Sequence, residues 1–370
     1  MLVSILVFIL VLSVLIISHE FGHFIVARKS GIKVEEFGFG LPPRLFSKKI
    51  GETVYSINAL PFGGFVRLHG EQEEDEGTNV KHSFLHKSKK VRAMVVIAGV
   101  VMNFLLAIIV FAIVYSFSGI PRDGGKVKVI DVASGSPAAN AGIVVGDIIT
   151  KVGGETIVLS DEFVAKTATY KGKRVTYEVQ RDINGQTKTL TVSLIPRENP
   201  PSGEGSVGVT ITTMEIYYPP VLLRPFYGIY YGFKDGIFWG KTIATGLWGL
   251  LSGIFEGKTP QGVSGPIGIY AVTTEASKSG FLTLLNFVGI LSVNLAILNV
   301  IPFPALDGGR LVFIGIETVT RKKVSRKVEA TINNIGFLLL LTLLLVITVG
   351  DVRRLVTNGG IDGFINSLGK

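Results

Sequence analysis

Four long apolar runs constrain the fold of this chain more than any other feature of its sequence. They lie near residues 2–26, 95–117, 281–301 and 335–349. A helix needs about 20 predominantly apolar residues to cross the roughly 30 Å hydrocarbon core of a bilayer, so each run is a candidate span. Hydrophobic residues make up 47% of the chain, and its mean hydropathy of +0.48 exceeds that of an ordinary soluble protein. The sequence therefore predicts a multi-pass α-helical membrane protein with four transmembrane helices in the lipid bilayer.

The basic residues indicate how these spans are oriented. The formal net charge is +9, but the Lys and Arg residues concentrate beside the apolar runs, which is typical of topology determinants and argues against nucleic-acid binding. The stretch between the first two runs is rich in them, and a second basic cluster occupies residues 321–327. Four spans place both stretches in the cytoplasm and the amino terminus outside. No Lys or Arg precedes the first run, so we expect a retained span rather than a cleaved signal peptide.

The segment Ile237–Phe255 is a candidate for a fifth span. It is apolar enough to cross, but a fifth crossing would move the basic cluster at 321–327 to the outside. Its interleaved glycines, its tryptophans and the charges of Lys234 and Lys241 favour an amphipathic helix in the membrane interface. We therefore predict an interfacial segment over residues 215–280, with a spanning helix as the alternative.

The motif His19-Glu20-Phe21-Gly22-His23 stands at the end of the first apolar run. Residues i and i+4 of a helix share a face, so His19 and His23 can bind one ion while Glu20 lies beside it as a base. A chance match is the alternative, but ionisable residues in a span are costly and mark functional sites. The chain has no cysteine, so a metal must take imidazole and carboxylate ligands. The motif predicts a Zn²⁺ site for hydrolysis.

Asp307 is the candidate for a third ligand. A catalytic zinc takes three protein ligands and keeps its fourth position open. Asp307 ends the segment Asn299-Val-Ile-Pro-Phe-Pro-Ala-Leu-Asp, which is followed by two glycines at the cytoplasmic end of the third span, the depth predicted for His19. The prolines interrupt helical hydrogen bonding and the glycines permit close approach, as expected where backbone lines a cavity. A solvated aspartate in a loop that ends the span is the alternative.

Two further regions carry strand patterns. Residues Val34–Arg67 alternate between apolar and polar side chains and are punctuated by Gly and Pro, which predicts a β-hairpin region. Such a region can pair with an extended substrate by strand addition, although a plain cytoplasmic hairpin is equally compatible. Five short strands with helices between them are predicted in an inserted α+β domain, at residues 127–132, 148–152, 175–180, 189–194 and 207–212.

These motifs together resemble the site-2 protease family of intramembrane zinc metalloproteases, and in particular its bacterial RseP-type branch. The resemblance rests on the HEFGH motif, Leu306-Asp-Gly308, Ser264–Ile269 and Gly63–Arg67, and so touches nearly the whole chain. It also implies that the hairpin region at Val34–Arg67 is associated with the membrane. The family usually has Ala-Gly-Pro before the asparagine of the second span, whereas this chain reads Ala98-Gly-Val-Val-Met-Asn103.

The family resemblance implies roles for six residues. His19, His23 and Asp307 would be the zinc ligands, and Glu20 the general base. Asn294 and Asn299 would hold the substrate backbone or the transition-state oxygen. For Asn294, hydrogen bonding between helices is an equally good explanation, because an amide in a span needs a partner.

The insert at residues 119–214 resembles a PDZ domain. The resemblance is carried by Ser136-Pro-Ala-Ala-Asn-Ala-Gly142 and by Gly146-Asp147. A single such domain departs from relatives with two in tandem, and PDZ domains hold extended peptides along a strand edge. The predicted organisation is a first membrane half at 1–118, this domain at 119–214, the interfacial segment at 215–280 and a second membrane half at 281–370.

The resemblance also implies a function and a location. The family cleaves transmembrane segments of single-pass proteins already trimmed on the outside, such as an anti-sigma factor or remnant signal peptides. We expect the chain in the bacterial cytoplasmic membrane, with the PDZ domain outside and the active site near the cytoplasmic side. The competing hypothesis is a non-catalytic membrane adaptor whose PDZ domain binds partners and whose metal site is vestigial. The sequence does not predict an oligomeric state.

Overall fold

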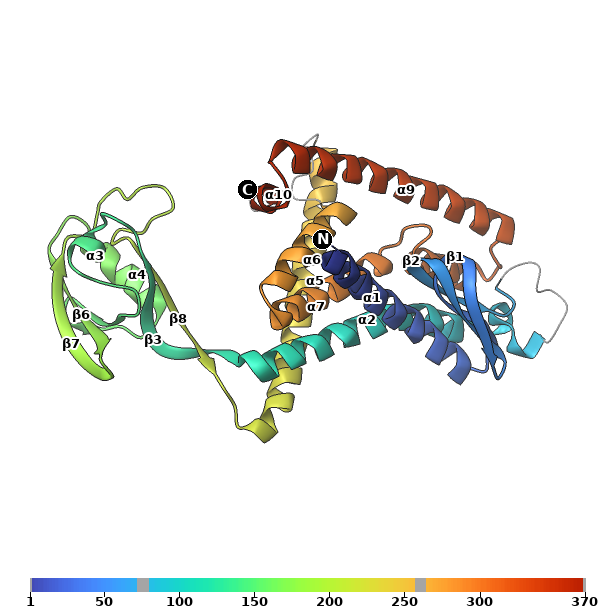
Figure 1. The fold of residues 1–370 in the computed structure, drawn as a ribbon, viewed down its shortest axis with the longest axis horizontal. Helices are drawn as coiled ribbons and strands as arrows, with labels where there is room; N and C mark the ends of the chain where they lie inside the picture. The colour runs from blue at the N-terminus through green and yellow to red at the C-terminus, as the bar shows by residue number, and fades with distance from the viewer. Residues whose placement is uncertain (1, 72–79, 257–263, 369–370) are drawn as a thin grey trace. The chain divides into compact units, whose positions relative to one another are not determined.

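A computed structural model describes residues 2–71, 80–256 and 264–368, which form two compact units (Figure 1). Unit 1 comprises Met1–Phe117 and Val221–Lys370, and unit 2 comprises Ser118–Pro220. Unit 1 contains the helices α1 (Leu2–Lys29), α2 (Lys89–Ser118), α5 (Arg224–Phe255), α6 (Pro266–Lys278), α7 (Phe281–Val300), α8 (Asp307–Thr320), α9 (Arg326–Thr357) and α10 (Ile361–Leu368). It also contains the strands β1 (Val34–Ile50) and β2 (Thr53–Leu68) and the short 3-10 helices η2 (Val80–His82), η3 (Phe84–His86) and η4 (Val221–Leu223).

Four helices in the described part of the chain are long and apolar enough to cross a membrane. They are Leu2–Lys29, Lys89–Ser118, Phe281–Val300 and Lys327–Thr357. Each lies where an apolar run predicted a span, and all but the third extend further than the run because charged residues continue the helix at one or both ends. The chain is therefore a membrane protein with four apolar helices, as predicted.

The helices α1, α2 and α7 pack together through small and branched apolar side chains. One buried cluster joins Val11 and Leu15 of α1 to Val110 of α2 and Val288 of α7. Nearer the HEFGH motif, α1 and α2 approach so closely that a Cβ atom on Gly22 would lie 2.2 Å from the carbonyl oxygen of Ala98. Gly22 is thus required for this helix crossing, which places the motif directly against α2.

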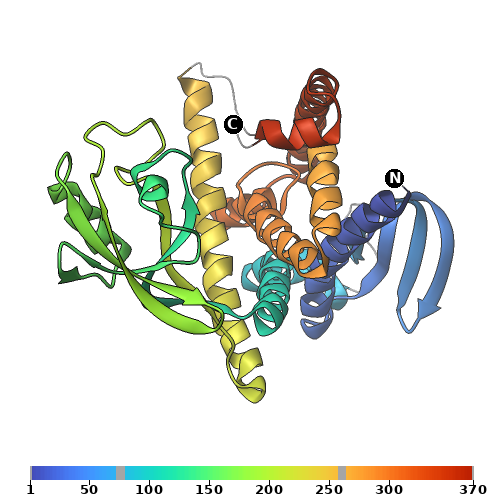
Figure 2. The same ribbon diagram turned by 60° about the vertical axis from the view of Figure 1, so that its left-hand side comes forward.

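The segment Ile237–Phe255 forms the later part of one uninterrupted helix, α5, which begins at Arg224 (Figure 2). Of the wider predicted segment at 215–280, residues 257–263 lie outside the described residues. The glycines in the first part of α5, Gly228, Gly232 and Gly236, face α2, and a Cβ atom on Gly228 would lie 2.5 Å from the Ala112 carbonyl oxygen. The Tyr115 hydroxyl of α2 also donates a hydrogen bond to Asp235 at 2.5 Å. The glycines at 240, 246 and 249, within Ile237–Phe255, make no such contact with α2: a Cβ atom on Gly240 would lie nearest to Val293 and Ile297 of α7, and one on Gly246 or Gly249 would meet nothing within 4 Å.

The strands β1 and β2 form a sheet in which more segments lie side by side than in a simple hairpin. Phe37 pairs with both Tyr55 and Val66, so the first half of β1 lies between the two halves of β2. The second half of β1 pairs only with residues 53–58 of β2. Residues 64–68 therefore form an outer strand, and in the described part of this sheet their other side pairs with no strand.

Unit 2 is an α+β domain with its own core. It contains β3 (Ile120–Val132), α3 (Pro137–Asn140), β4 (Ile148–Val152), β5 (Glu155–Thr156), α4 (Ser160–Thr169), β6 (Val175–Ile183), β7 (Gln186–Leu194) and β8 (Val209–Tyr217). The strand order is β7-β6-β4-β3-β8, and β5 pairs with β4. The predicted strands are all present, but only β4 has the predicted bounds. β3 begins earlier and pairs there with the end of β8, which runs past its predicted end, and β6 and β7 extend toward the turn that joins them. Its buried core includes Val127, Ile149, Val152, Tyr177 and Val179.

The Gly146-Asp147 motif has a structural role in unit 2. Asp147 is fully buried and accepts two hydrogen bonds of 2.7 Å from Arg181. The same arginine donates to the carbonyl oxygen of Gly142 at 2.7 Å. The hydrogen bond to Asp147 raises the pKa of Arg181. This pair fixes the turn that precedes β4.

Candidate metal centre

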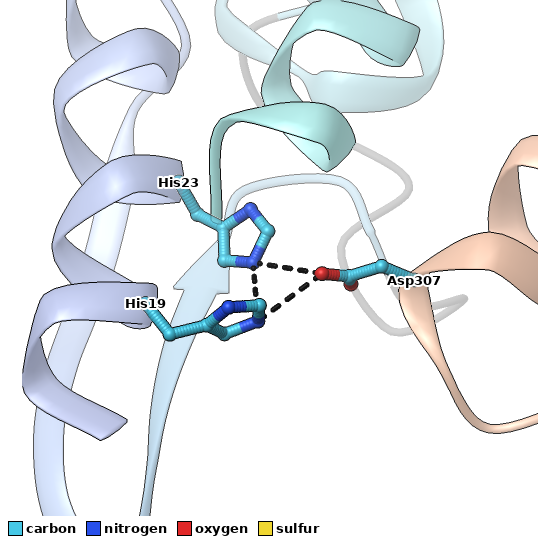
Figure 3. Close-up of side chains that lie close together, drawn as sticks. All are labelled: His19, His23 and Asp307. Carbon is cyan, nitrogen blue, oxygen red and sulfur yellow. Dashed lines mark hydrogen bonds and ion pairs between the residues drawn. The ribbon is translucent and has the colours of Figure 1, made fainter. Parts of the chain in front are cut away.

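Three side chains from distant parts of the sequence converge in unit 1 (Figure 3). His19 and His23 extend from one face of α1, and Asp307 from the first residue of α8. The Nε2 atoms of the two histidines lie 3.2 Å apart. Asp307 Oδ2 lies 3.1 Å from His19 Nε2 and 3.3 Å from His23 Nε2. The structure thus brings together the three residues predicted to bind zinc.

The spacing of these three atoms fits a zinc ion. Ligands at about 2.0–2.1 Å from a tetrahedral zinc are separated from one another by about 3.3 Å. Asp307 Oδ2 is buried and has no hydrogen-bond donor among the described residues. Three lone-pair atoms repel one another at this distance unless a cation or protons lie between them. The donor set, two imidazoles and a carboxylate, is also that of known catalytic zinc sites.

A backbone carbonyl fixes the orientation of His23. Its Nδ1 atom lies 2.8 Å from the carbonyl oxygen of Val95 on α2. A carbonyl can only accept, so Nδ1 carries the proton and Nε2 keeps its lone pair. The close crossing at Gly22 brings this carbonyl within reach of the ring. Sequence patterns do not indicate this contact, since any residue can supply a backbone carbonyl.

Gly99 of α2 makes room for both imidazole rings. A Cβ atom on Gly99 would lie 2.4 Å from His23 Nε2 and 2.6 Å from His19 Cε1. Contacts this short do not occur between real Cβ atoms and their neighbours, so only glycine fits here. Gly99 therefore belongs to the site although it contributes no functional group.

The loop between α7 and α8 aims Asp307 at the histidines. Gly308 and Gly309 pack against this loop. A Cβ atom on Gly308 would lie 2.1 Å from the carbonyl oxygen of Ile301, and one on Gly309 would lie 2.4 Å from the carbonyl oxygen of Phe303. Ala305 adopts a φ of +72°, which is uncommon outside glycine. The tight turn agrees with the expectation from the prolines and glycines that backbone lines a cavity here.

Glu20 faces the same cavity as the three ligand candidates. The cavity has a volume of about 200 Å³, and its walls include His19, Glu20, His23 and Asp307. The outer strand of the sheet closes it on another side through Gly64–Val66. A Cβ atom on Gly64 would lie 3.3 Å from Glu20 Cγ, so the strand passes directly over the glutamate. A peptide laid along this strand would reach both Glu20 and the metal position.

The two asparagines of α7 differ in position. Asn299 Nδ2 lies 3.5 Å from His19 Nε2, so its amide points toward the metal position. Asn294 is five residues away on the helix, and no described residue forms a hydrogen bond to its side chain. The structure therefore brings the amide of Asn299 to one of the three ligand candidates.

A second cavity adjoins the first. Its volume is about 860 Å³, and it shares Phe65, Val66 and Arg310 with the smaller cavity. Arg310 Nη1 pairs with Glu71 Oε1 at 2.6 Å. The charge of Glu71 raises the pKa of Arg310, so the side chain stays cationic. The metal site thus opens toward a larger space whose boundary carries a paired positive charge.

Comparison with known proteins gives a consistent assignment. The model of peptidase family M50 matches residues 7–343. A protein of Clostridium perfringens that carries a zinc metalloprotease name is 38% identical over 350 residues, which cover 93% of this chain and 96% of that protein. The zinc metalloprotease RasP of Geobacillus kaustophilus is 30% identical over 428 residues, covering 95% of this chain and 98% of RasP.

One solved structure, the PDZ domain of an SdrC-like protein from Listeria monocytogenes, covers 25% of this chain and 90% of its own at 24% identity. Its TM-score of 0.20 does not establish a shared fold. The family match, in contrast, includes both the HEFGH motif and Asp307, and it confirms the predicted family resemblance. The chain belongs to peptidase family M50, the site-2 protease family of zinc metalloproteases.

Proposed function

We propose that this membrane zinc metalloprotease is an endopeptidase that cleaves transmembrane segments of single-pass proteins already trimmed on the outside. The observation that carries the proposal is the convergence of His19, His23 and Asp307 in a cavity that also contains Glu20. The site is built on helices long and apolar enough to cross the membrane. A hydrolytic centre at this place acts on substrates that are themselves in the bilayer.

The chemistry follows from the positions of the side chains. A zinc ion held by His19, His23 and Asp307 would polarise the scissile carbonyl and make a water molecule more acidic. Glu20 accepts the proton of the attacking water as its oxygen bonds to the carbonyl carbon. Glu20 then returns this proton to the departing amine as the C–N bond breaks. The Asn299 amide, which points toward the metal position, would donate to the oxygen that becomes negative.

A transmembrane helix must unwind before its peptide bonds can be attacked. The outer strand at residues 64–68 offers an extended substrate the backbone partners that it loses on unwinding. This strand borders the cavity that contains Glu20. Strand addition therefore delivers an extended substrate to the reacting groups. The exposed side chains of Leu45, Phe46 and Ile50 support placement of this sheet at the membrane.

We further propose that the chain lies in the bacterial cytoplasmic membrane with its active site near the cytoplasmic side. The support is the distribution of Lys and Arg between the spans. Unit 2 would then be extracytoplasmic and act as a PDZ domain that excludes bulky substrates or binds a freshly cut end. An anti-sigma factor or a remnant signal peptide is the substrate class that the family resemblance supports.

A cleavage assay with a model transmembrane substrate in liposomes tests the proposal. Wild type is expected to bind zinc and to cleave. Glu20→Gln should keep its zinc but lose about 10²–10⁴-fold in rate, because the general base is gone. Asp307→Ala should lose the metal.

Retained cleavage by Glu20→Gln would contradict the mechanism. Wild-type protein that binds no zinc and cleaves nothing would instead favour the adaptor hypothesis.

A further inference from the structure

Asn103 of α2 is a fully buried amide beside the metal centre. Its Nδ2 atom lies 3.4 Å from His19 Nδ1, and its Oδ1 atom has no hydrogen-bond partner among the described residues. The Ser292 hydroxyl of α7 donates to the backbone carbonyl of Asn103 at 2.7 Å. The residue is therefore held between α1 and α7, with one end of its side chain against His19.

The tautomer of His19 conflicts with this placement of the amide. To bind a metal through Nε2, which faces Asp307 and His23, the ring must carry its proton on Nδ1. An Nδ1–H group facing an amide NH₂ group leaves two donors in contact and the amide oxygen without a partner. The oxygen and nitrogen of an asparagine are interchangeable by a half-turn of the amide, and only the hydrogen-bond network distinguishes them. The half-turn removes the conflict and places the oxygen against Nδ1–H.

We propose that Asn103 is a positioning residue that accepts a hydrogen bond from His19 Nδ1–H and so fixes the ring for metal binding. This inference rests on the zinc site proposed above. It gives the two histidines matching partners on one helix, because Val95 of α2 already accepts from His23 Nδ1. Partners of this kind orient metal-binding imidazoles and raise their basicity, and their loss typically costs about 10–100-fold in metal affinity.

Zinc affinity of the full chain in detergent, measured by competition with a chelator, tests the role of Asn103. Asn103→Leu keeps the approximate volume and removes the acceptor, so the dissociation constant should rise about 10–100-fold. Asn103→Asp supplies an acceptor and no donor, so its zinc affinity should equal or exceed that of wild type. Thermal unfolding of the metal-free proteins is recorded in parallel.

Ser292→Ala is the matched control. It removes a hydrogen bond to the backbone of Asn103 and leaves the side chain amide in place. A purely structural role for Asn103 predicts that Asn103→Leu and Ser292→Ala change zinc affinity only in proportion to their loss of stability. The positioning role predicts a loss of affinity in Asn103→Leu alone and its rescue in Asn103→Asp.

Two results would overturn the inference while leaving the proposed function intact. One is wild-type zinc affinity in Asn103→Leu, and the other is an equal loss in Asn103→Asp and Asn103→Leu. Failure of the proposed function appears differently, because wild type itself would then bind no zinc.

Discussion

At the scale of single residues, the site depends on a position that has no side chain. Replacing Gly99 with Ala would put a methyl group 2.4 Å from His23 Nε2. The glycine backbone is part of α2 and cannot move away without separating packed helices, so the imidazole must be displaced. Gly99→Ala is therefore expected to abolish zinc binding, measured as metal content after purification.

Gly315→Ala is the control for this substitution. A Cβ atom on Gly315 of α8 would meet nothing within 4 Å, and alanine is the better helix former. This variant should keep its zinc. A Gly99→Ala protein that binds zinc like wild type would show that the rings have more room than the distances indicate.

The two asparagines of α7 should affect catalysis differently. Asn299 points toward the metal position, so Asn299→Ala should lower kcat by about 10²–10³-fold, as expected for loss of a transition-state donor. Its zinc content should not change. Asn294→Ala removes a group that forms no hydrogen bond to the three ligand candidates in the described part of the chain, so any effect is expected in KM. Equal losses of kcat in both variants, in the same cleavage assay, would contradict this assignment.

The residues of the site differ in how far they could be predicted from the sequence. The spacing of His19, Glu20 and His23 is a local pattern, and a helix turns it into a shared face. Asp307 needed a further argument, the depth of the third span, because nothing in the sequence joins it to residues nearly 300 positions away. Asn103 was visible only as the asparagine of the second span. Its contact with His19 depends on how α1 crosses α2, which no linear pattern contains.

At the scale of the elements, a buried ion pair joins α2 to α8. Arg92 Nη1 lies 2.7 Å from Glu317 Oε2, and both side chains are 6% exposed. Removing one partner leaves an uncompensated buried charge, which typically costs about 3–5 kcal/mol. Glu317→Ala should lower the free energy of unfolding by this amount in a denaturant titration in mixed micelles. The double variant Arg92→Met/Glu317→Leu should lose much less, because it leaves no charge behind.

An exposed ion pair of unit 2 provides the comparison. Arg122 Nη2 lies 2.9 Å from Glu215 Oε1, and about half of each side chain is exposed. Such pairs contribute about 0–1 kcal/mol to stability, so Glu215→Ala should hardly change the free energy of unfolding. If Glu317→Ala changes the free energy of unfolding as little as Glu215→Ala does, then the ion pair between α2 and α8 is hydrated in the membrane protein.

The elements themselves were predictable where a period or a composition marks them. The four apolar helices follow from hydropathy, and the strands of unit 2 follow from alternation. Alternation shows which face a side chain occupies but not which strand lies beside it, so the position of β1 between the two halves of β2 could not be predicted. The contacts of Gly228 and Gly232 with α2 could not be predicted for a similar reason, because small residues suit both an exposed helix and a close helix contact.

At the scale of the whole molecule, the chain enters and leaves unit 2 at adjacent points. Ile120 pairs with Tyr217, and paired residues of antiparallel strands lie about 5 Å apart. Unit 2 has a buried core of its own, and the metal site uses only residues of unit 1. A short Gly/Ser linker in place of residues 121–216 should therefore leave unit 1 able to fold. The shortened protein is expected to bind zinc with wild-type affinity.

The same deletion separates the two roles proposed for unit 2. If unit 2 excludes bulky substrates, the shortened protein should cleave a substrate with an intact outer domain, which the full chain leaves uncut. If it recognises a freshly cut end, cleavage of the trimmed substrate should fall instead, through a higher KM. Glu20→Gln in the shortened protein is the control, because it must abolish whatever cleavage is seen. Loss of zinc on deletion would contradict the premise, since it would mean that the fold of the metal site depends on the insert.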